Sequence, residues 1–507
     1  MLAKVMSSTL LGVDAWLVEV EVDLANGLPT FTTVGLPDTS IRESRDRVKA
    51  ALVNSGFPFP LKRITVNLAP AHLRKEGTAF DLPIALGLLH AAGYIESNSL
   101  ERYLVVGELS LDGRVKAITG AMPMAITAHQ EGLAGMVVPA DNAPEAAVIE
   151  GIPVYGVETL AQAIGFFNGT ETIPQMVCDV KALFQQQAIY SEDLADVKGQ
   201  QHVKRALEVA AAGAHNVLLI GPPGSGKSLL ARRLPSILPD MEVAEAIETT
   251  KIHSIAGLLH RDHALVATRP FRAPHHSTSD AGLIGGGTVP TPGEVSLAHH
   301  GVLFLDELPE FRRSVLEVLR QPLEDAQVTI ARAAMTLTFP ARFMLAAAMN
   351  PCPCGFLDDP QHTCQCSPLQ IRRYRARISG PLLDRIDIHV DVPPVRYAEL
   401  TATLSTETSA DIRLRVNAAR AQQRERFAGT GMPHNAAMGV REIRRYCQLD
   451  NAGEQLLAQA MQRFGLSARA HDRIRKVART IADLAGAAAI TAEHLSEAIQ
   501  YRTLDRQ

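Results

Sequence analysis

The chain has 507 residues, enough for about three domains of ordinary size. Hydrophobic residues make up 46% and charged residues 21%, a balance that excludes a largely disordered chain. The formal charge is −4, yet residues 411–480 hold 14 Arg and Lys against 6 Asp and Glu, so we expect a basic patch on a slightly acidic body.

No stretch reaches the roughly 18 uninterrupted apolar residues of a membrane-spanning helix. The first 16 residues lack the long apolar core and the cleavage site of a signal peptide. We therefore expect a cytoplasmic protein with no membrane partner.

The first 165 residues predict an α/β domain. Alternating apolar residues predict strands, and helical spacing predicts helices, the first with a serine cap. The strands fall at 16–24, 30–34, 64–68, 104–106 and 136–139, and the helices at 40–55 and 81–92. Residues 166–195 carry Gly, Pro and polar residues without steady periodicity, which predicts a linker.

The rest of the chain predicts two further domains. A second α/β unit is expected over 196–394 and a helical domain over 395–507, with helix caps at Ser467 and Thr491. The fold class is therefore α/β followed by a helical region.

A phosphate-binding loop is the most specific motif. An apolar run, 217–220, leads into the G-x-x-x-x-G-K-S pattern and then a helix, a context that disfavours a chance glycine-rich turn. Its residues are Gly221, Pro222, Pro223, Gly224, Ser225, Gly226, Lys227 and Ser228. Backbone N–H groups would surround phosphate oxygens, Lys227 would bridge the β- and γ-phosphates of ATP, and Ser228 would bind Mg²⁺.

Polar residues follow two further apolar strands. The run 301–305 ends in Asp306 and Glu307, and the run 343–349 ends in Asn350. Parallel sheets place ligands at such strand ends. We expect Asp306 to hold Mg²⁺ through water, Glu307 to polarise the attacking water and Asn350 to orient it. The alternatives are a solvated acidic strand end and an ordinary Asn-Pro turn.

Four cysteines follow Asn350 within fifteen residues. Cys352, Cys354, Cys364 and Cys366 form C-x-C-x₉-C-x-C, which predicts a structural Zn²⁺ site, with His362 as a substitute ligand. Free or redox-active thiols are the alternative. Such a loop would emerge from the sheet of the nucleotide site.

Basic residues gather in two stretches. Arg372, Arg373, Arg375, Arg377 and Arg385 form the first, and Arg441, Arg444 and Arg445 the second. Arginines of this kind either follow a DNA backbone or pair with inter-subunit carboxylates or nucleotide. The pair His275–His276 is expected in a structural or DNA-contacting loop, because adjacent residues do not face one metal.

Beyond these motifs, nearly the whole chain resembles the ComM (YifB) family of magnesium-chelatase-like AAA+ ATPases. The ordered segments that carry the resemblance are 196–228, 269–287, 292–311, 350–355 and 377–393. The resemblance implies a homo-hexameric ring with ATP and Mg²⁺ between subunits. Arg385 matches the arginine finger that reaches a neighbour's γ-phosphate, and Arg469 matches the second sensor arginine of the helical lid.

The N-terminal domain resembles a Lon-protease-like domain. The matched nucleophile position is Ala79 and the matched lysine position is Pro123, with Ser110 and Lys116 out of register. A Ser–Lys dyad needs an oxygen nucleophile and an amine base. We therefore expect a noncatalytic domain with an assembly or DNA-handling role.

The resemblance also implies the function. Family members are helicases that drive branch migration during homologous recombination and natural transformation, so single-stranded or branched DNA and recombination proteins are the expected partners. The alternatives are a metal-insertion motor like magnesium chelatase and an unfoldase or assembly chaperone.

Overall fold

The computed structural model describes residues 2–96, 99–259, 264–287, 290–332, 335–359, 362–395 and 407–502. The chain forms two compact units. The first contains 1–188 and 243–267, and the second contains 189–242 and 268–507. The start and the end of the predicted helical domain, 396–406 and 503–507, lie outside the described residues.

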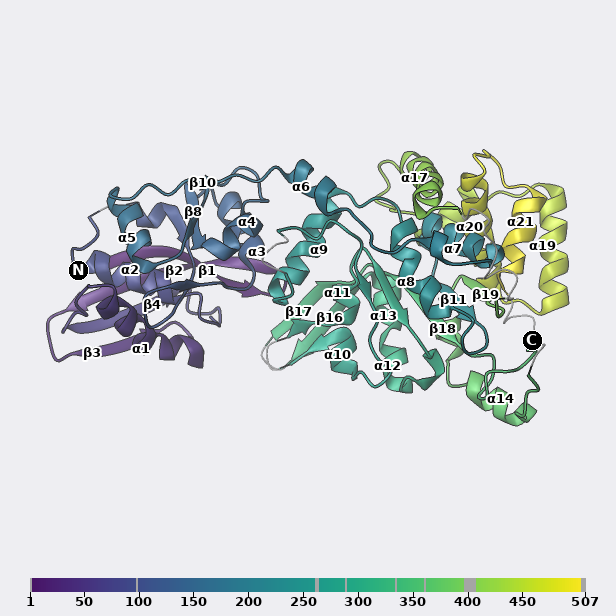
Figure 1. Cartoon of the computed structure of the whole chain (residues 1–507), viewed down its shortest axis with the longest axis horizontal. Coiled ribbons are helices and arrows are strands. Elements are labelled where there is room, and N and C mark those ends of the chain that lie inside the picture. The colour runs from purple at the N-terminus through teal and green to yellow at the C-terminus, as the bar shows by residue number, and fades with distance from the viewer. Residues whose placement is uncertain are drawn as a thin grey trace. The chain divides into compact units, whose positions relative to one another are not determined.

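The first unit is built on an eight-stranded mixed sheet in the order β10-β9-β8-β5-β1-β2-β4-β3 (Figure 1). All five predicted strands are present, and every second residue of β4, and of β2 from Val18 to Leu24, is buried, as alternation requires. The strands are β1 (Leu2–Leu11), β2 (Asp14–Ala25), β3 (Thr30–Val34), β4 (Arg63–Ala69), β5 (Tyr103–Val105), β8 (Gly135–Pro139), β9 (Val154–Val157) and β10 (Gln175–Met176), with a separate pair β6 (Glu108–Leu109) and β7 (Val115–Lys116).

Helices complete this unit. They are α1 (Thr39–Asn54), α2 (Asp81–Ala91), α3 (Ala121–Gln130), α4 (Ala143–Ala146), α5 (Leu160–Asn168), α6 (Val180–Gln187) and α9 (Val243–Ile255). The serine cap predicted for α1 is wrong: Asp38 precedes the helix, and its carboxylate accepts from the Ile41 N–H at 2.9 Å. A carboxylate at this position also interacts favourably with the helix dipole.

Two segments differ from what the sequence predicted, one in its secondary structure and one in the unit to which it belongs. The stretch 166–195 contains the end of α5, the edge strand β10 and α6. Residues 243–267 cluster with the first unit, and the Lys251 ammonium of α9 lies 2.8 Å from the Asp14 carboxylate.

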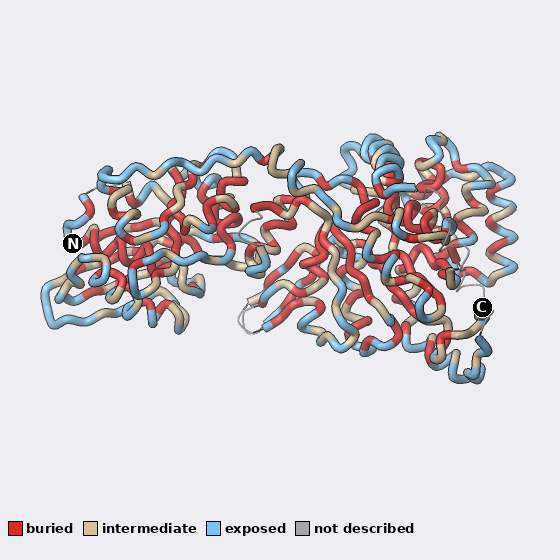
Figure 2. The backbone as a smooth tube through the Cα atoms, in the orientation of Figure 1, coloured by how far each residue is buried: buried red, intermediate tan, exposed pale blue. Residues whose placement is uncertain are grey.

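The second unit contains a parallel five-stranded sheet in the order β12-β15-β18-β11-β19. Its strands are β12 (Phe271–Arg272), β15 (Val302–Leu305), β18 (Met344–Met349), β11 (Val217–Ile220) and β19 (Ile388–Asp391). The residues of β11, β15 and β18 are all buried, as expected of a parallel sheet covered on both faces (Figure 2).

The helices α7 (Gln201–Gly213) and α8 (Lys227–Ile237) flank this sheet, and a helical lid follows it in the chain. The lid contains α17 (Ser409–Arg426), α18 (Val440–Tyr446), α19 (Asn451–Phe464), α20 (Ala468–Leu484) and α21 (Ala492–Gln500), and the predicted caps Ser467 and Thr491 are confirmed. Sheet and lid share one apolar core.

Shorter elements fill the connections of the second unit. They are α10 (Asp280–Ile284), β13 (Gly285–Gly286), β14 (Thr291–Pro292), α11 (Glu294–Leu297), α12 (Arg313–Val318), α13 (Arg320–Asp325), the hairpin β16 (Gln327–Arg332) with β17 (Met335–Pro340), α14 (Pro368–Arg375) and α15 (Gly380–Leu383). Among the described helices of the whole chain, none is both long and apolar enough to cross a membrane.

Candidate nucleotide-binding site

The predicted phosphate loop connects β11 to α8, with the strand, turn and helix in the predicted order. Gly224 and Gly226 adopt φ values of +77° and +87°, which favour glycine. A Cβ on Gly221 would lie 2.2 Å from the Val392 carbonyl oxygen, so only glycine fits there. The loop therefore presents its backbone at the N-terminus of α8, where an anion is favoured.

Lys227 is almost fully buried beneath this loop. Its ammonium donates to the carbonyl oxygens of Gly221 and Pro222 at 2.7 and 2.8 Å, and to Asn350 Oδ1 at 3.2 Å. Burial lowers the pKa of Lys227, while Asp306 and Glu307 act in the opposite direction. These carboxylates favour the charged lysine, the form that binds phosphate.

Three strand ends meet at this point because β11, β18 and β15 are parallel neighbours. Ser228 Oγ donates to Asp306 Oδ2 at 2.6 Å, joining the start of α8 to the end of β15. A hydroxyl beside a carboxylate is a donor set that suits Mg²⁺. The structure thus brings together Lys227, Ser228, Asp306 and Asn350.

A buried polar atom of the loop that lacks a hydrogen-bond partner also fits a polar ligand. Ser225 Oγ is buried and has no hydrogen-bond partner among the described residues. Gln200, which was not predicted as a site residue, donates from Nε2 to the carbonyl oxygens of Ser225 and Pro393 at 2.8 and 2.9 Å. Its place inside the 196–228 motif was the available signal.

Glu307 follows Asp306 with a left-handed backbone, φ +52°, and its side chain is 57% exposed. Nδ1 of His276 lies 3.4 Å from its carboxylate oxygen Oε2. The sequence did not predict this contact, because His276 lies about thirty residues away in a loop without periodicity.

Arg385 and Arg469 lie together in one cavity of this unit. They line a cavity of about 430 Å³ with Arg342, Arg473 and Lys476, and its lining contains none of the phosphate-loop residues. Arg385 pairs with Glu324, and Arg469 donates to Asp384 at 2.8 Å. Burial and then the neighbouring arginines lower the pKa of Arg385, as expected of a cationic wall.

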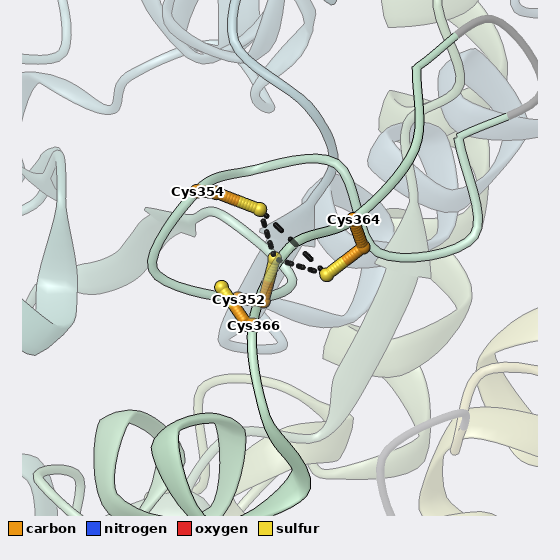
Figure 3. A group of neighbouring side chains, drawn as sticks. All are labelled: Cys352, Cys354, Cys364 and Cys366. Atoms are coloured by element: carbon orange, nitrogen blue, oxygen red, sulfur yellow. Dashed lines mark hydrogen bonds between the residues drawn. The ribbon is translucent and has the colours of Figure 1, made fainter.

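The four clustered cysteines converge on one point (Figure 3). The sulfur of Cys352 lies 3.4 Å from that of Cys354 and 3.7 Å from that of Cys364, and the Cys354 and Cys364 sulfurs are 3.6 Å apart. The Sγ atom of Cys366 lies within 4.8 Å of the other three. A zinc tetrahedron with bonds of about 2.3 Å has edges of about 3.8 Å, so these thiols fit Zn²⁺.

The predicted basic residues are largely exposed. Arg372 and Arg373 of α14 and all three arginines of α18, Arg441, Arg444 and Arg445, face solvent. Arg377 differs because its guanidinium donates to Glu310 at 2.8 Å, and Arg375 is half-buried.

The positions matched to a protease dyad supply no such chemistry. Ala79 has no hydroxyl, and Pro123 is buried in α3. The hydroxyl of Ser110 donates to Asp112 Oδ1 at 2.6 Å, and Lys116 stands opposite Glu108 in the β6–β7 pair. Ser110 therefore closes a turn.

The chain matches known protein families. Three family models match: magnesium chelatase, subunit ChlI, over 193–400; subunit ChlI of Mg-chelatase over 20–142; and the C-terminal part of magnesium chelatase subunit ChlI over 406–502.

Relatives extend the likeness to the full length. The chain is 46% identical to the competence protein ComM of Haemophilus influenzae and 43% identical to YifB of Escherichia coli, covering 100% of this chain and 98% of each relative. The magnesium-chelatase 38 kDa subunit of Rhodobacter capsulatus is 27% identical over 31% of this chain and 49% of its own length. The chain belongs to the ComM/YifB family of magnesium-chelatase-like AAA+ ATPases.

Proposed function

We propose that this protein is an ATP-driven hexameric DNA motor, a helicase that promotes branch migration during homologous recombination and natural transformation. The observation that carries the ATPase part is the meeting of Lys227, Ser228, Asp306 and Asn350 at three adjacent parallel strand ends, with Glu307 next to them. The motor part rests on the family and on the exposed arginines.

The proposed chemistry is attack of water on the γ-phosphate of ATP. Bound Mg²⁺ would neutralise charge on the phosphate oxygens, held by Ser228 and, through water, by Asp306. The Lys227 ammonium would exchange its carbonyl partners for phosphate oxygens. Glu307 would accept the proton of the attacking water, and the Asn350 amide would orient that water.

Arg385 and Arg469 would act on the nucleotide of a neighbouring subunit. Their shared cavity contains none of the chain's own phosphate-loop residues, which favours a partner in trans. A planar guanidinium suits the charge that develops on a transferred phosphoryl group. A closed ring of identical subunits supplies one such contact to every site.

DNA would follow the exposed arginines of α14 and α18. Arginine binds backbone phosphate without regard to sequence, as a motor that moves along DNA requires. The name of the Haemophilus influenzae relative, a competence protein, supports a role in DNA uptake and recombination. Recombination proteins are the proposed further partners, and Zn²⁺ at the four cysteines is the proposed cofactor beside ATP and Mg²⁺.

Metal insertion is the second candidate, because three magnesium-chelatase family models match. The magnesium-chelatase subunits match only 31% of the chain, whereas ComM and YifB match all of it. The longer match favours the DNA motor. An unfoldase or assembly chaperone, with the first unit as adaptor, is the third candidate.

DNA stimulation of ATP hydrolysis separates these candidates. We expect a four-way junction to raise the turnover of the purified protein about tenfold and to be driven to branch migration, because a motor couples hydrolysis to its track. Lys227→Ala should abolish ATP turnover and branch migration. Lys251→Ala, which changes a lysine of the first unit, should leave both activities unchanged. A turnover that stays the same with single-stranded, duplex and junction DNA would eliminate the proposal.

A further inference from the structure

The segment that carries the cysteines touches the phosphate loop directly. Gly355 stands in the turn after Cys354, with φ +85°. A Cβ on Gly355 would lie 2.5 Å from Cδ and 2.8 Å from Cγ of Pro223, a residue of the phosphate loop. The backbone at Gly355 therefore packs against the outside of that loop, and no larger residue fits between them.

The same segment also holds Asn350 from its other end. Helix α14 begins directly after Cys366, and Ser367 closes its first turn with a capping box. Tyr374 of α14 is buried, and burial raises the pKa of its phenol to about 12, while the nearby backbone of Asn350 acts in the opposite direction. The Arg375 guanidinium donates to the Pro351 carbonyl oxygen at 3.2 and 3.3 Å.

The cysteines lie next to the residues that make these contacts, namely Gly355 and helix α14. Cys352 is fully buried beside Asn350, Cys354 precedes Gly355, and Cys364 and Cys366 precede α14. Short loops of this kind bury few apolar side chains, so without a cross-link their shape is weakly determined. A metal bound by four thiolates supplies folding free energy that the loop lacks.

We propose that a Zn²⁺ ion bound by Cys352, Cys354, Cys364 and Cys366 holds this segment as a support for the nucleotide site. The segment fixes the position of Pro223 in the phosphate loop through Gly355, and it fixes the position of Asn350 through α14. Loss of the metal then weakens ATP binding although no ligand cysteine contacts ATP. The inference rests on the proposed ATP site and assigns the metal a positioning role within it.

Metal content and nucleotide affinity are measured together to test this. Protein purified with reductant and without chelator should contain one zinc per chain. Cys364→Ser should lose the zinc and bind a fluorescent ATP analogue about tenfold more weakly, because the support is loosened. Cys178→Ser changes a half-buried cysteine of the first unit, and this variant should keep its zinc and its affinity for the ATP analogue.

A glycine substitution separates the support from the metal. Gly355→Ala leaves all four thiols in place but puts a methyl group into Pro223, so zinc should be retained while the affinity for the ATP analogue falls. Gly429→Ala is the matched control: Gly429 has φ +75°, with no atom within 4 Å of an added Cβ. It carries the same backbone strain without the contact and should bind ATP normally.

The outcomes distinguish the two proposals. If wild-type protein hydrolyses ATP but contains no zinc, the metal site is refuted. If zinc loss and Gly355→Ala both leave the affinity for the ATP analogue unchanged, the supporting role is refuted while the ATPase stands. If zinc-loaded wild-type protein, with Mg²⁺, fails to bind the analogue, the ATP site itself falls.

Discussion

The backbone around Glu307 gives its side chain a position that suits the role proposed for it. Its φ of +52° turns the chain sharply directly after Asp306, whose Oδ1 accepts from the Glu307 N–H at 2.9 Å. The carboxylate thus leaves the strand end toward solvent and toward His276. A carboxylate exposed in this way can meet water, whereas Asp306 is held against Ser228.

Glu307→Gln tests this division of labour. The amide keeps the shape but cannot accept a proton, so ATP hydrolysis should fall by about 10²–10⁴-fold while affinity for ATP stays within about twofold. Turnover and equilibrium nucleotide binding are measured on the same protein. Glu310→Gln, an exposed glutamate three residues further on, should retain full activity.

Two results would contradict the assignment. Full turnover in Glu307→Gln would remove Glu307 as the base. Loss of nucleotide binding in that variant would give it a binding role instead.

At the scale of single residues, the sequence predicted the features that depend on residues adjacent in the chain. The residues from Gly221 to Ser228 lie next to one another in the chain, and their spacing alone defines the phosphate loop. The contacts of Gln200, His276 and Gly355 were missed, because each depends on the tertiary approach of a distant segment and leaves no period in the sequence.

At the scale of helices and strands, the parallel sheet explains why the site could be predicted in part. Apolar runs predicted β11, β15 and β18, of which β11 leads into the phosphate loop and the other two end in polar residues. The rule for parallel sheets then predicted a common edge for Ser228, Asp306 and Asn350. The position of α9 in the first unit could not be predicted from the sequence, because a helical period does not show which element the helix packs against. The same holds for β10, which joins a sheet edge through two residues.

Sheet and lid are joined by a buried polar network. His215, directly after α7, contacts Asp387 at 3.2 Å through Nδ1 and Thr480 of α20 at 2.8 Å through Nε2. Arg473 of the same helix pairs with Asp387. Burial acts to raise the pKa of Asp387, but Arg473 and His215 outweigh it, and the pKa lies below its ordinary value of 3.8.

This lowered pKa gives a pH-dependent stability. As the pH falls, the unfolded chain binds the proton at position 387 before the folded protein does, so the contribution is complete above about pH 4 and is lost below it. Asp387→Asn should lower the free energy of unfolding by about 3–5 kcal/mol at pH 7, because the half-buried Arg473 and the buried His215 lose their ionised partner. The difference from wild type should shrink as the pH falls below 4.

Urea denaturation followed by circular dichroism at pH 7, 5 and 3 measures both effects. Asp472→Asn changes a more exposed carboxylate of α20, whose side chain is 41% exposed, and should have little effect. A stability difference that is the same at all three pH values would contradict the link to the ionised carboxylate.

At the scale of the whole molecule, the proposed nucleotide site and the two proposed in-trans arginines belong to different parts of the second unit. Lys227 and Glu307 stand beside the phosphate loop, whereas Arg385 and Arg469 line a cavity whose walls include neither. The phosphate loop was predicted from its motif and the two arginines from the family resemblance, and the structure shows that the arginines share one cavity. In the proposed ring, the arginines of each subunit would reach the nucleotide bound by the next subunit.

A mixing experiment tests this composite site most directly. Arg385→Ala chains keep their own phosphate loop and Glu307, and Glu307→Gln chains keep their arginines. Each variant alone should bind ATP and hydrolyse almost none. In randomly mixed rings about one quarter of the interfaces join an intact Glu307 to an intact Arg385, so turnover should return to about one quarter of the wild-type value. Mixed rings, verified by native mass spectrometry, that hydrolyse no more ATP than either variant alone would contradict a site completed by the neighbouring subunit.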